Sequence, residues 1–301
     1  MRDVVTGAFG YTGRYIAERL LASGREVRTI TGHRSRPSPF GDRIDVAPFD
    51  FGEPARLVEH LRGADTLYNT YWIRFPRGDA TFERAVKNGR TLIDAALRAG
   101  VRRIVHVSIT NPSEDSPFPY FRGKAKIEEL VRGSGLGYAI VRPTVVFGRG
   151  DILINNIAFL LRRLPLFGIP GAGSYRIRPV SVEDLADLCV RLGAEDESRI
   201  VDAVGPETFT FEGLVRLIAR TVRRRAWIVH VPPAVALAAA SAIGRVVGDV
   251  VVTRDELGGL MAELVTTEGR ATGSRALSQW LAVNADTVGR RYAPELARHY
   301  R

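Results

Sequence analysis

The stretch that decides the fold lies near the start of the chain and reads Val4-Val5-Thr6-Gly7-Ala8-Phe9-Gly10-Tyr11-Thr12-Gly13. Two valines precede three glycines, and a helical pattern follows in which Ile16 and Leu20 share one face. Such glycines let the chain turn sharply, let the backbone approach a pyrophosphate, and let a helix pack closely on a strand. A tight turn without a ligand is the simpler alternative. The place between strand and helix favours a dinucleotide site with the phosphates at the helix N-terminus.

The residues after the second expected strand (25–31) bear on which dinucleotide is bound. NAD sites usually place an acidic residue about 20 residues past the glycines, where it holds the ribose hydroxyls. Here that position is Gly32, and the basic residues His33, Arg34 and Arg36 follow. Guanidinium groups can bind a 2′-phosphate, so the sequence predicts NADP in preference to NAD. A solvated basic loop is the alternative interpretation of the same residues.

Strands and helices alternate along the first half of the chain. Further strands are expected at 45–51, 66–72 and 103–108, with helices at 54–62 and 81–99. This alternation predicts a doubly wound parallel sheet with helices on both faces, a Rossmann-type α/β fold. Ligands of such sheets bind at the carboxyl ends of the strands. Besides the glycines and the basic loop, the residues expected to contact the cofactor are Phe9, Tyr11, Thr12, Asp50, Phe51, Asn69, Thr70 and Tyr71.

A second motif follows the fifth strand. Ser108 ends that strand, and Tyr120 and Lys124 lie one turn apart on one face of a helix that runs to Arg132. A lysine ammonium beside a phenol favours the phenolate and lowers its pKa. A free tyrosine titrates near about 10, so acid–base work near neutrality needs a shift of roughly three units, about 4 kcal/mol. Many surface helices contain such a pair, but its place after the fifth strand of a dinucleotide fold indicates catalysis.

Together with the glycine stretch, three segments carry a family resemblance: His106-Val107-Ser108, Tyr120-x-x-x-Lys124 and Arg142-Pro143-Thr144-Val145-Val146-Phe147-Gly148. The chain resembles the short-chain dehydrogenases/reductases of the extended and atypical type. Within them it is similar to the epimerase/dehydratase-like enzymes and to the NAD(P)H-binding subunit of respiratory complex I. Asn88 also matches the asparagine of the family's fourth helix. The resemblance covers about residues 1–205.

The resemblance implies a role for each matching residue. Tyr120 is implied as the acid/base, Lys124 as the residue that binds the nicotinamide ribose, and Ser108 as the hydroxyl that orients a carbonyl or alcohol. Ser108 and Tyr120 are only 12 positions apart, which is shorter than is usual in the extended enzymes. Thr110 and Ser113 are therefore alternatives for the working hydroxyl. The residues implied to flank the nicotinamide are Pro143, Thr144 and Val145.

The pattern changes after Gly148, and a division into two parts is expected there. Residues 1–150, with return segments at about 179–205, are predicted to form the dinucleotide-binding domain. Residues 151–178 and 206–301 are predicted to form a smaller α+β part that binds and caps the substrate. The aromatic loop after the fourth strand and the apolar helix 151–161 suggest a mostly apolar or aromatic pocket. The residues predicted to bind substrate are Trp72, Thr110, Arg149, Asn155, Asn156 and Arg178.

Some of these substrate residues have simpler interpretations. Asn155 and Asn156 lie in an apolar segment, where they act either as caps or as ligands. Arg149 and Arg178 suit a carboxylate or phosphate, and surface arginines are the alternative.

Composition limits the remaining function classes. The chain has 301 residues and a formal net charge of +10, from 43 basic and 33 acidic residues. No nucleic-acid recognition motif accompanies this charge, so nucleic acid is not expected as a partner. The single Cys189 excludes an internal disulfide framework, and the scattered histidines form no metal-ligand cluster. No signal peptide precedes the first strand, so a cytoplasmic location is expected.

One stretch bears on membranes. Residues 234–252 are apolar and small but contain Arg245 and Asp249, which makes them unsuited to span a bilayer. A buried core helix is the main expectation for this stretch, and weak membrane-surface contact is the alternative.

These observations predict an NADP-dependent oxidoreductase that acts on a small-molecule carbonyl or alcohol, as a monomer or homodimer. Two alternatives stay open at this point. One is an NAD-dependent epimerase or dehydratase, and the other is a non-catalytic NAD(P)H-binding protein with a structural or redox-sensing role.

Overall fold

The computed structural model describes residues 1–33 and 36–300, with the side chains of residues 298 and 299 left out. Its contacts divide the chain into two compact units. The first comprises Met1–Pro143 and Val182–Ala203, and the second comprises Thr144–Ser181 and Val204–Arg301. The use of the second unit for substrate binding stays a prediction.

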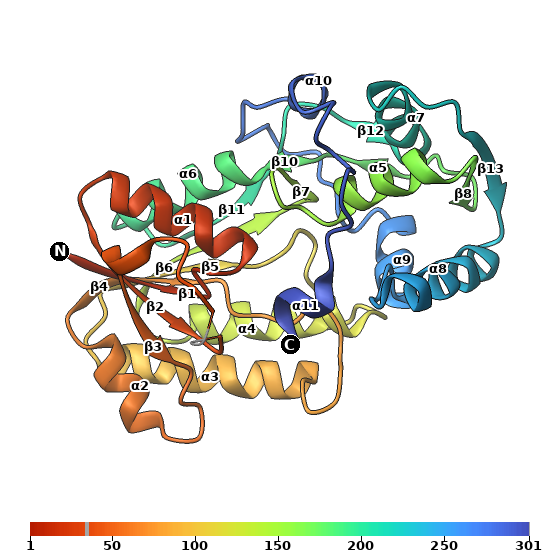
Figure 1. The fold of residues 1–301 in the computed structure, drawn as a ribbon. Helices are drawn as coiled ribbons and strands as arrows, with labels where there is room; N and C mark the ends of the chain where they lie inside the picture. The colour runs from red at the N-terminus through yellow and green to blue at the C-terminus, as the bar shows by residue number, and fades with distance from the viewer. Residues whose placement is uncertain (34–35, 301) are drawn as a thin grey trace. The chain divides into compact units, whose positions relative to one another are not determined.

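Seven parallel strands form the sheet of the first unit, in the order β11-β6-β5-β4-β1-β2-β3 (Figure 1). Short apolar runs such as Val4-Val5 and Ile104-Val105 form these strands because both faces of the sheet are buried. The strands are β1 (Arg2–Thr6), β2 (Glu26–Thr31), β3 (Ile44–Pro48), β4 (Ala64–Asn69), β5 (Arg103–Val107), β6 (Gly137–Pro143) and β11 (Arg199–Ala203).

Helices cover both faces of this sheet. Helices α1 and α6 pack together on one face, and α2, α3 and α4 pack on the other (Figure 1). The strand order reverses between β1 and β4, which makes the carboxyl ends of these two strands the expected binding crevice. The Rossmann-type fold predicted from the sequence is therefore confirmed. The helices are α1 (Tyr11–Ala22), α2 (Pro54–Leu61), α3 (Phe82–Arg98), α4 (Pro119–Arg132) and α6 (Val182–Gly193).

The second unit has its own hydrophobic core, built mainly from α5 and α7, with Leu161, Leu214 and Ile218 fully enclosed. Its short strands form three two-stranded pairs, β10-β7, β12-β9 and β13-β8. The strands are β7 (Val146–Phe147), β8 (Leu166–Pro170), β9 (Arg176–Ile177), β10 (Val180–Ser181), β12 (Phe209–Thr210) and β13 (Trp227–Val231). The helices are α5 (Leu153–Arg163), α7 (Phe211–Thr221), α8 (Pro233–Val247), α9 (Arg254–Met261), α10 (Leu277–Val283) and α11 (Glu295–His299).

Helix α8 corrects one expectation. The sequence favoured burial of this apolar stretch, but Gly244 is the helix's one buried residue, and Val246 is 87% exposed. Six of its 15 residues are alanines, which form helices readily and gain little from burial. The expectation of a core helix is therefore wrong for this segment. In the part of the chain that the structure describes, no helix has the length and apolarity needed to cross a bilayer.

Candidate active site

The glycine turn joins β1 to α1 through a closely packed backbone. Gly7 has φ +65°, a left-handed conformation that favours glycine. Its amide donates to the carbonyl of Ile30 over 2.9 Å, and its own carbonyl accepts from the amide of Gly10 over 2.8 Å. A Cβ atom on Gly13 would lie 2.5 Å from the carbonyl oxygen of Gly7. This contact brings the first turn of α1 directly against the end of β1.

The N-terminus of α1 suits a pyrophosphate. Its N-cap is Gly10, which offers no side-chain cap, and the first turn contains no acidic residue. The positive end of the helix dipole therefore faces no carboxylate of its own first turn. Phe9, Tyr11 and Thr12 line this turn and are partly exposed. The turn thus fits the phosphates of a dinucleotide, as the sequence predicts.

Replacing Gly13 with alanine tests this geometry. We expect the added methyl to push α1 away from Gly7 and to weaken NADPH binding at least about tenfold, because the phosphates depend on the position of the helix N-terminus. The measurement is a fluorescence titration of NADPH. Gly133→Ala is the matched control, because its Cβ would meet its nearest atom at an ordinary 3.4 Å. Equal affinities for the two variants would contradict the assignment of the turn to the phosphates.

Hydrogen bonds fix the adjoining end of β4 to β1. The amide of Thr70 donates to the Thr6 hydroxyl over 2.7 Å, and the Thr70 hydroxyl donates to the Thr6 carbonyl over 2.5 Å. The buried Asn69 accepts from the amide of Tyr71 over 3.0 Å and pairs with Nδ1 of His106 over 3.1 Å. Asn69 and Thr70, both predicted to contact the cofactor, therefore shape the loop that enters the crevice.

An aromatic group lies at the carboxyl ends of β3 and β4. The rings of Phe49 and Phe51 stack with centroids 5.0 Å apart, and the ring of Tyr71 lies 5.1 Å from each. Burial raises the pKa of the Tyr71 phenol, which accepts a hydrogen bond from Asn88 over 2.8 Å. Asp50, between the two phenylalanines, pairs with His60 over 3.3 Å. These rings form an aromatic cluster where the adenine is expected.

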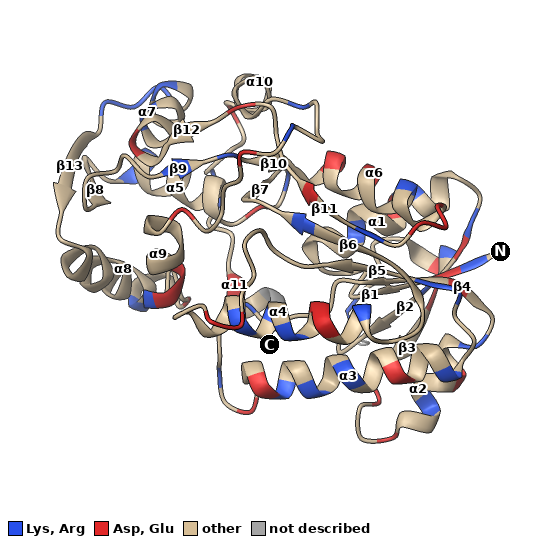
Figure 2. Ribbon diagram, turned by 180° about the vertical axis from the view of Figure 1, so that it is seen from behind, with Lys and Arg blue, Asp and Glu red and all other residues tan. Residues whose placement is uncertain are grey.

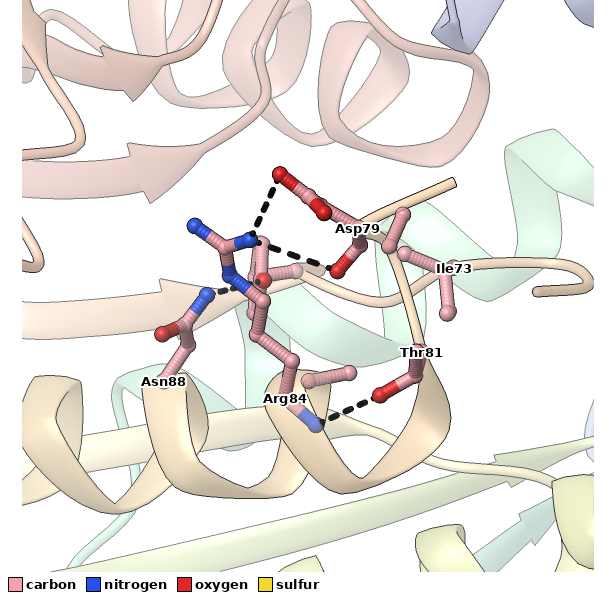
Figure 3. A pocket seen from close by; sticks show the side chains of 8 residues that line it. Ile73, Asp79, Thr81, Arg84 and Asn88 are labelled. Carbon is pink, nitrogen blue, oxygen red and sulfur yellow. Dashed lines mark hydrogen bonds and ion pairs between the residues drawn. The ribbon is translucent and has the colours of Figure 1, made fainter. Parts of the chain in front are cut away.

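A pocket of about 300 Å³ begins at the same tyrosine (Figure 3). Arg84 reaches across it to Asp79, with Nη1 3.4 Å from a carboxylate oxygen. The sequence motifs point to Tyr71 and Asn88. No motif in the segment between them indicates the other residues that line the pocket. The lining residues are Tyr71, Ile73, Asp79, Ala80, Thr81, Arg84, Ala85 and Asn88.

Helix α4 carries the tyrosine–lysine pair. Lys124 is 3% exposed, and its Nζ donates to the carbonyl of Val107 over 2.9 Å. The indole of Trp72 covers this amine, with its ring centroid 4.9 Å from Nζ. Burial lowers the pKa of Lys124 to about 7, and the nearby carboxylate of Glu128 opposes that shift. The lysine is thus anchored at the carboxyl end of β5, immediately before Ser108.

Tyr120 lies one turn earlier on the same helix and is partly exposed. The rings of Trp72 and Phe82 meet the Tyr120 ring edge-on, each with centroids 6.0 Å apart. Trp72, predicted to contact substrate, therefore packs against both members of the Tyr120–Lys124 pair. Its ring also lies against Gly123, where a Cβ would approach within 2.7 Å.

Ser108 donates its hydroxyl proton to a buried carboxylate. Its Oγ lies 2.5 Å from Oε1 of Glu128, and Glu128 pairs with Arg142 over 2.5 Å. The Ser108 oxygen then has only its lone pairs to offer a ligand. Sequence reasoning did not identify Glu128, although its spacing was a signal: Tyr120, Lys124 and Glu128 recur every four residues on one helical face.

The alternative hydroxyls lie in the loop after β5. Thr110 is buried, and its amide donates to the carbonyl of Pro143 over 3.1 Å. Ser113 is exposed and accepts from the amide of Asp115 over 3.2 Å. Thr110 therefore ties this loop to the end of β6, while Ser113 stabilises a turn.

The basic loop follows β2. Gly32 is exposed, and the amide of His33 donates to the hydroxyl of Thr31 over 3.1 Å. The amide of Arg36 donates to the carbonyl of His33 over 3.2 Å. Arg34 lies outside the described residues.

The second unit contains the other predicted residues. Asn155 donates to the carbonyl of Arg291 over 2.9 Å, and Asn156 exchanges two hydrogen bonds with the backbone of Ala293. Both amides thus brace the carboxyl-terminal segment, and their part in substrate binding stays a prediction.

Arg178 also binds backbone. Its guanidinium donates to the carbonyl groups of Gly205, Thr267 and Gly269. The hydroxyl of Thr144 donates to the carbonyl of Arg178 over 2.6 Å. The carbonyl of Val145 accepts from Val180 over 2.8 Å, and Arg149 is exposed. The contacts of Arg178, Thr144 and Val145 shape the second unit, and the ligand roles of all four residues stay predictions.

Comparisons with known proteins agree with this geometry. A family model described as NAD(P)H-binding matches residues 7–160, about half of the chain. The 40 kDa subunit of mitochondrial NADH-ubiquinone oxidoreductase from Neurospora crassa is 26% identical over 262 residues, which is 84% of this chain and 68% of that protein. The (4-alkanoyl-5-oxo-2,5-dihydrofuran-3-yl)methyl phosphate reductase of Streptomyces griseus is 26% identical over 97% of this chain and 99% of its own length.

The solved structures show the same fold. The NADPH-dependent quinone oxidoreductase of Escherichia coli, solved with NADPH, superposes with a TM-score of 0.75 at 20% identity. The match covers 95% of this chain and 98% of that one. The resemblance stated from the sequence motifs is confirmed by these matches. The chain belongs to the NAD(P)H-binding family.

Proposed function

We propose that the protein is an NADP-dependent oxidoreductase that moves a hydride to or from a carbonyl or alcohol. The observation that carries this proposal is the anchoring of Lys124 on the carbonyl of Val107, with Tyr120 one turn before it. This arrangement holds a lysine and a tyrosine at the carboxyl end of β5, beside the crevice that the glycine turn and the end of β4 form.

When the substrate is a carbonyl, residues of the chain supply the proton that completes its reduction. A bound NADPH supplies the hydride to the carbonyl carbon. The Tyr120 hydroxyl donates its proton to the carbonyl oxygen, so that the product is a neutral alcohol. Lys124 holds the ribose and, when protonated, stabilises the tyrosinate that remains. Solvent then returns a proton to Tyr120.

The Ser108–Glu128 hydrogen bond gives Ser108 a specific part in this scheme. Because the Ser108 hydroxyl already donates its hydrogen bond to Glu128, Ser108 can only accept a further hydrogen bond. It therefore accepts one from a hydroxyl group and does not donate one to a carbonyl. In the reduction scheme that hydroxyl belongs to the alcohol product, because the one proton of Tyr120 goes to the substrate carbonyl. Arg142 binds the Glu128 carboxylate and so holds it beside Ser108.

NADP is the proposed cofactor because basic residues follow β2 where NAD sites carry an acid. We expect Arg36→Ala together with Arg34→Ala to weaken NADPH binding about tenfold or more while changing NADH binding less than twofold, since only NADPH carries the 2′-phosphate. Fluorescence titration with both cofactors measures this. Arg43→Ala, in the same connection between β2 and β3, is the control. A preference for NADPH that survives the double substitution would contradict the phosphate assignment.

The substrate test uses a panel of carbonyl compounds with NADPH and follows its oxidation by absorbance. The relatives named above suggest enones, phosphorylated furanones and quinones as panel members. NADPH-dependent turnover of any of them supports the proposal. The competing role is binding without turnover, and the similarity to a complex I subunit favours it. Tight NADPH binding with no turnover across the panel would establish that alternative over the enzyme.

A further inference from the structure

Four arginines of the second unit converge on one pocket of about 330 Å³. We call it the arginine pocket, and its residues are Arg162, Arg163, Arg224 and Arg290. Arg162 and Arg163 end α5, Arg224 follows α7, and Arg290 belongs to the segment before α11. Figure 2 shows the run 223–225 as a blue connection between α7 and β13.

The arginine pocket is strongly basic, since all four of its lining residues are arginines. Among the described residues, none of the four arginines has a carboxylate oxygen within ion-pair distance. Arg162 and Arg163 donate to backbone carbonyls instead, for example to that of Val288 over 2.9 Å. Burial and the charges of Arg290 and Arg224 lower the pKa of Arg162, while Asp286 opposes this. Elsewhere many arginines of the chain pair with acids, as Arg176 does with Glu263.

Exposed apolar side chains follow the arginines of this pocket closely in the sequence. We call Leu164, Leu166 and Trp227 the apolar rim, and they are 39%, 50% and 77% exposed. Trp227 and Leu166 are register partners on the parallel strands β13 and β8, so their side chains point to the same face of that pair. The amide of Trp227 also donates to the carbonyl of Pro165 over 2.8 Å.

The connectivity of the chain keeps the apolar rim close to the arginine pocket. Leu164 directly follows Arg163, and Trp227 is three residues after Arg224, a span of at most about 11 Å. The second unit therefore presents a tryptophan, two leucines and a set of guanidiniums at one place on its surface.

We propose that the arginine pocket and the apolar rim dock this protein onto a membrane surface that contains anionic phospholipid. Arginine binds phosphate through paired N–H donors, and tryptophan is favoured at the boundary between headgroups and acyl chains. A surface that combines both features gains from apolar insertion and from charge attraction at once. The contact is peripheral, and it is independent of the proposed catalysis.

Two other occupants fit less well. A second copy of this chain would bring its own charge of +10 against the same arginines in a symmetric contact, which is repulsive. A nucleic acid would use aromatic side chains between the cations for base stacking, but two of the three rim residues are leucines.

The test is vesicle binding by the full chain, measured by cosedimentation. We expect binding to vesicles of phosphatidylcholine mixed with phosphatidylglycerol and none to phosphatidylcholine alone. Arg224→Glu with Arg290→Glu should weaken binding at least about tenfold, since each cation near an anionic surface contributes about fivefold. Arg224 and Arg290 are chosen because both are exposed. Arg224→Lys with Arg290→Lys should retain most of the binding, and all variants are checked by thermal melting.

Arg98→Glu with Arg132→Glu is the matched control, because these exposed arginines of α3 and α4 produce the same change in net charge. We expect the control to bind as the unaltered protein does. An equal loss in the control pair, or equal binding to both kinds of vesicle, would overturn the proposal.

The apolar rim has a test of its own. Trp227 fluorescence should shift to the blue and become protected from acrylamide when anionic vesicles are added, and Trp227→Ser should remove both effects and weaken binding. If Trp227→Ser binds anionic vesicles normally and glycerol phosphate displaces the vesicles, the arginine pocket binds a soluble phosphate and the membrane assignment is overturned. Duplex DNA binding lost in the same glutamate variant, or a dimer that the variant disrupts, would each overturn the membrane assignment.

Discussion

Tyr120→Phe will lower kcat for carbonyl reduction about 10³-fold and leave the Kd for NADPH within about twofold, since general acid catalysis contributes 10²- to 10⁴-fold. The phenylalanine ring keeps the edge-on contacts with Trp72 and Phe82, so only the hydroxyl is removed. The measurements are steady-state kinetics on a substrate from the carbonyl panel and a fluorescence titration of NADPH.

The control for this variant is Tyr138→Phe. Tyr138 lies near the amino end of β6, at the opposite edge of the sheet from the carboxyl ends. It should retain full turnover. Unchanged kcat in Tyr120→Phe would rule out the tyrosine as proton donor, whereas loss of NADPH affinity would point to a distorted site.

Lys124→Met will remove a pH dependence from the stability of the cofactor-free protein. In the folded protein burial lowers the pKa of Lys124 to about 7, while a lysine of the unfolded chain titrates near about 10.4. Between these values the unfolded state binds more protons than the folded state, so the free energy of unfolding rises with pH. Below about pH 7 both states are protonated, and the cost of the buried charge is constant.

The size of this pH dependence follows from the range between the two pKa values of Lys124, about 7 in the folded protein and about 10.4 in the unfolded chain. Between about pH 7.5 and 9, the free energy of unfolding of the unaltered protein should gain about 2 kcal/mol relative to Lys124→Met. Urea unfolding at several pH values measures this difference, and the titration of the buried Cys189 cancels because both proteins contain it. Lys87→Met, an exposed lysine of α3, should show no such trend. A flat difference for Lys124→Met would mean that the amine is not buried as described.

The features that could be predicted from the sequence are those whose geometry depends on residues close together in the chain. The glycine turn and the Tyr120–Lys124 pair each lie within one strand–turn–helix or one helix, so their geometry follows from local rules. The parallel sheet with helices on both faces follows from the alternation of strands and helices, and that prediction is confirmed.

Features that depend on tertiary packing escaped prediction. Glu128 becomes a partner of Ser108 and Arg142 only because α4 packs on β5 and β6. Trp72 stands in the sequence as one of several aromatic residues, and only the path of the loop after β4 places it over Lys124.

Hydrophobicity was misleading for α8. Its average apolarity matches that of a core helix, yet alanine side chains remove little area from water when they are buried. The hydrogen-bond partners of the two asparagines of α5 could not be predicted either, because these partners lie more than a hundred residues further along the chain.

The bond between Asn156 and Ala293 has a consequence for how the protein is made. The two residues are 137 positions apart, and a ribosome that adds about 5–20 residues per second needs roughly 7–27 s to pass from one to the other. During that interval α5 has already been synthesised while the buried amide of Asn156 waits for its partner. The second unit can therefore complete its packing only after Ala293 has emerged, and nascent chains that stall earlier should be the preferred substrates of chaperones and proteases.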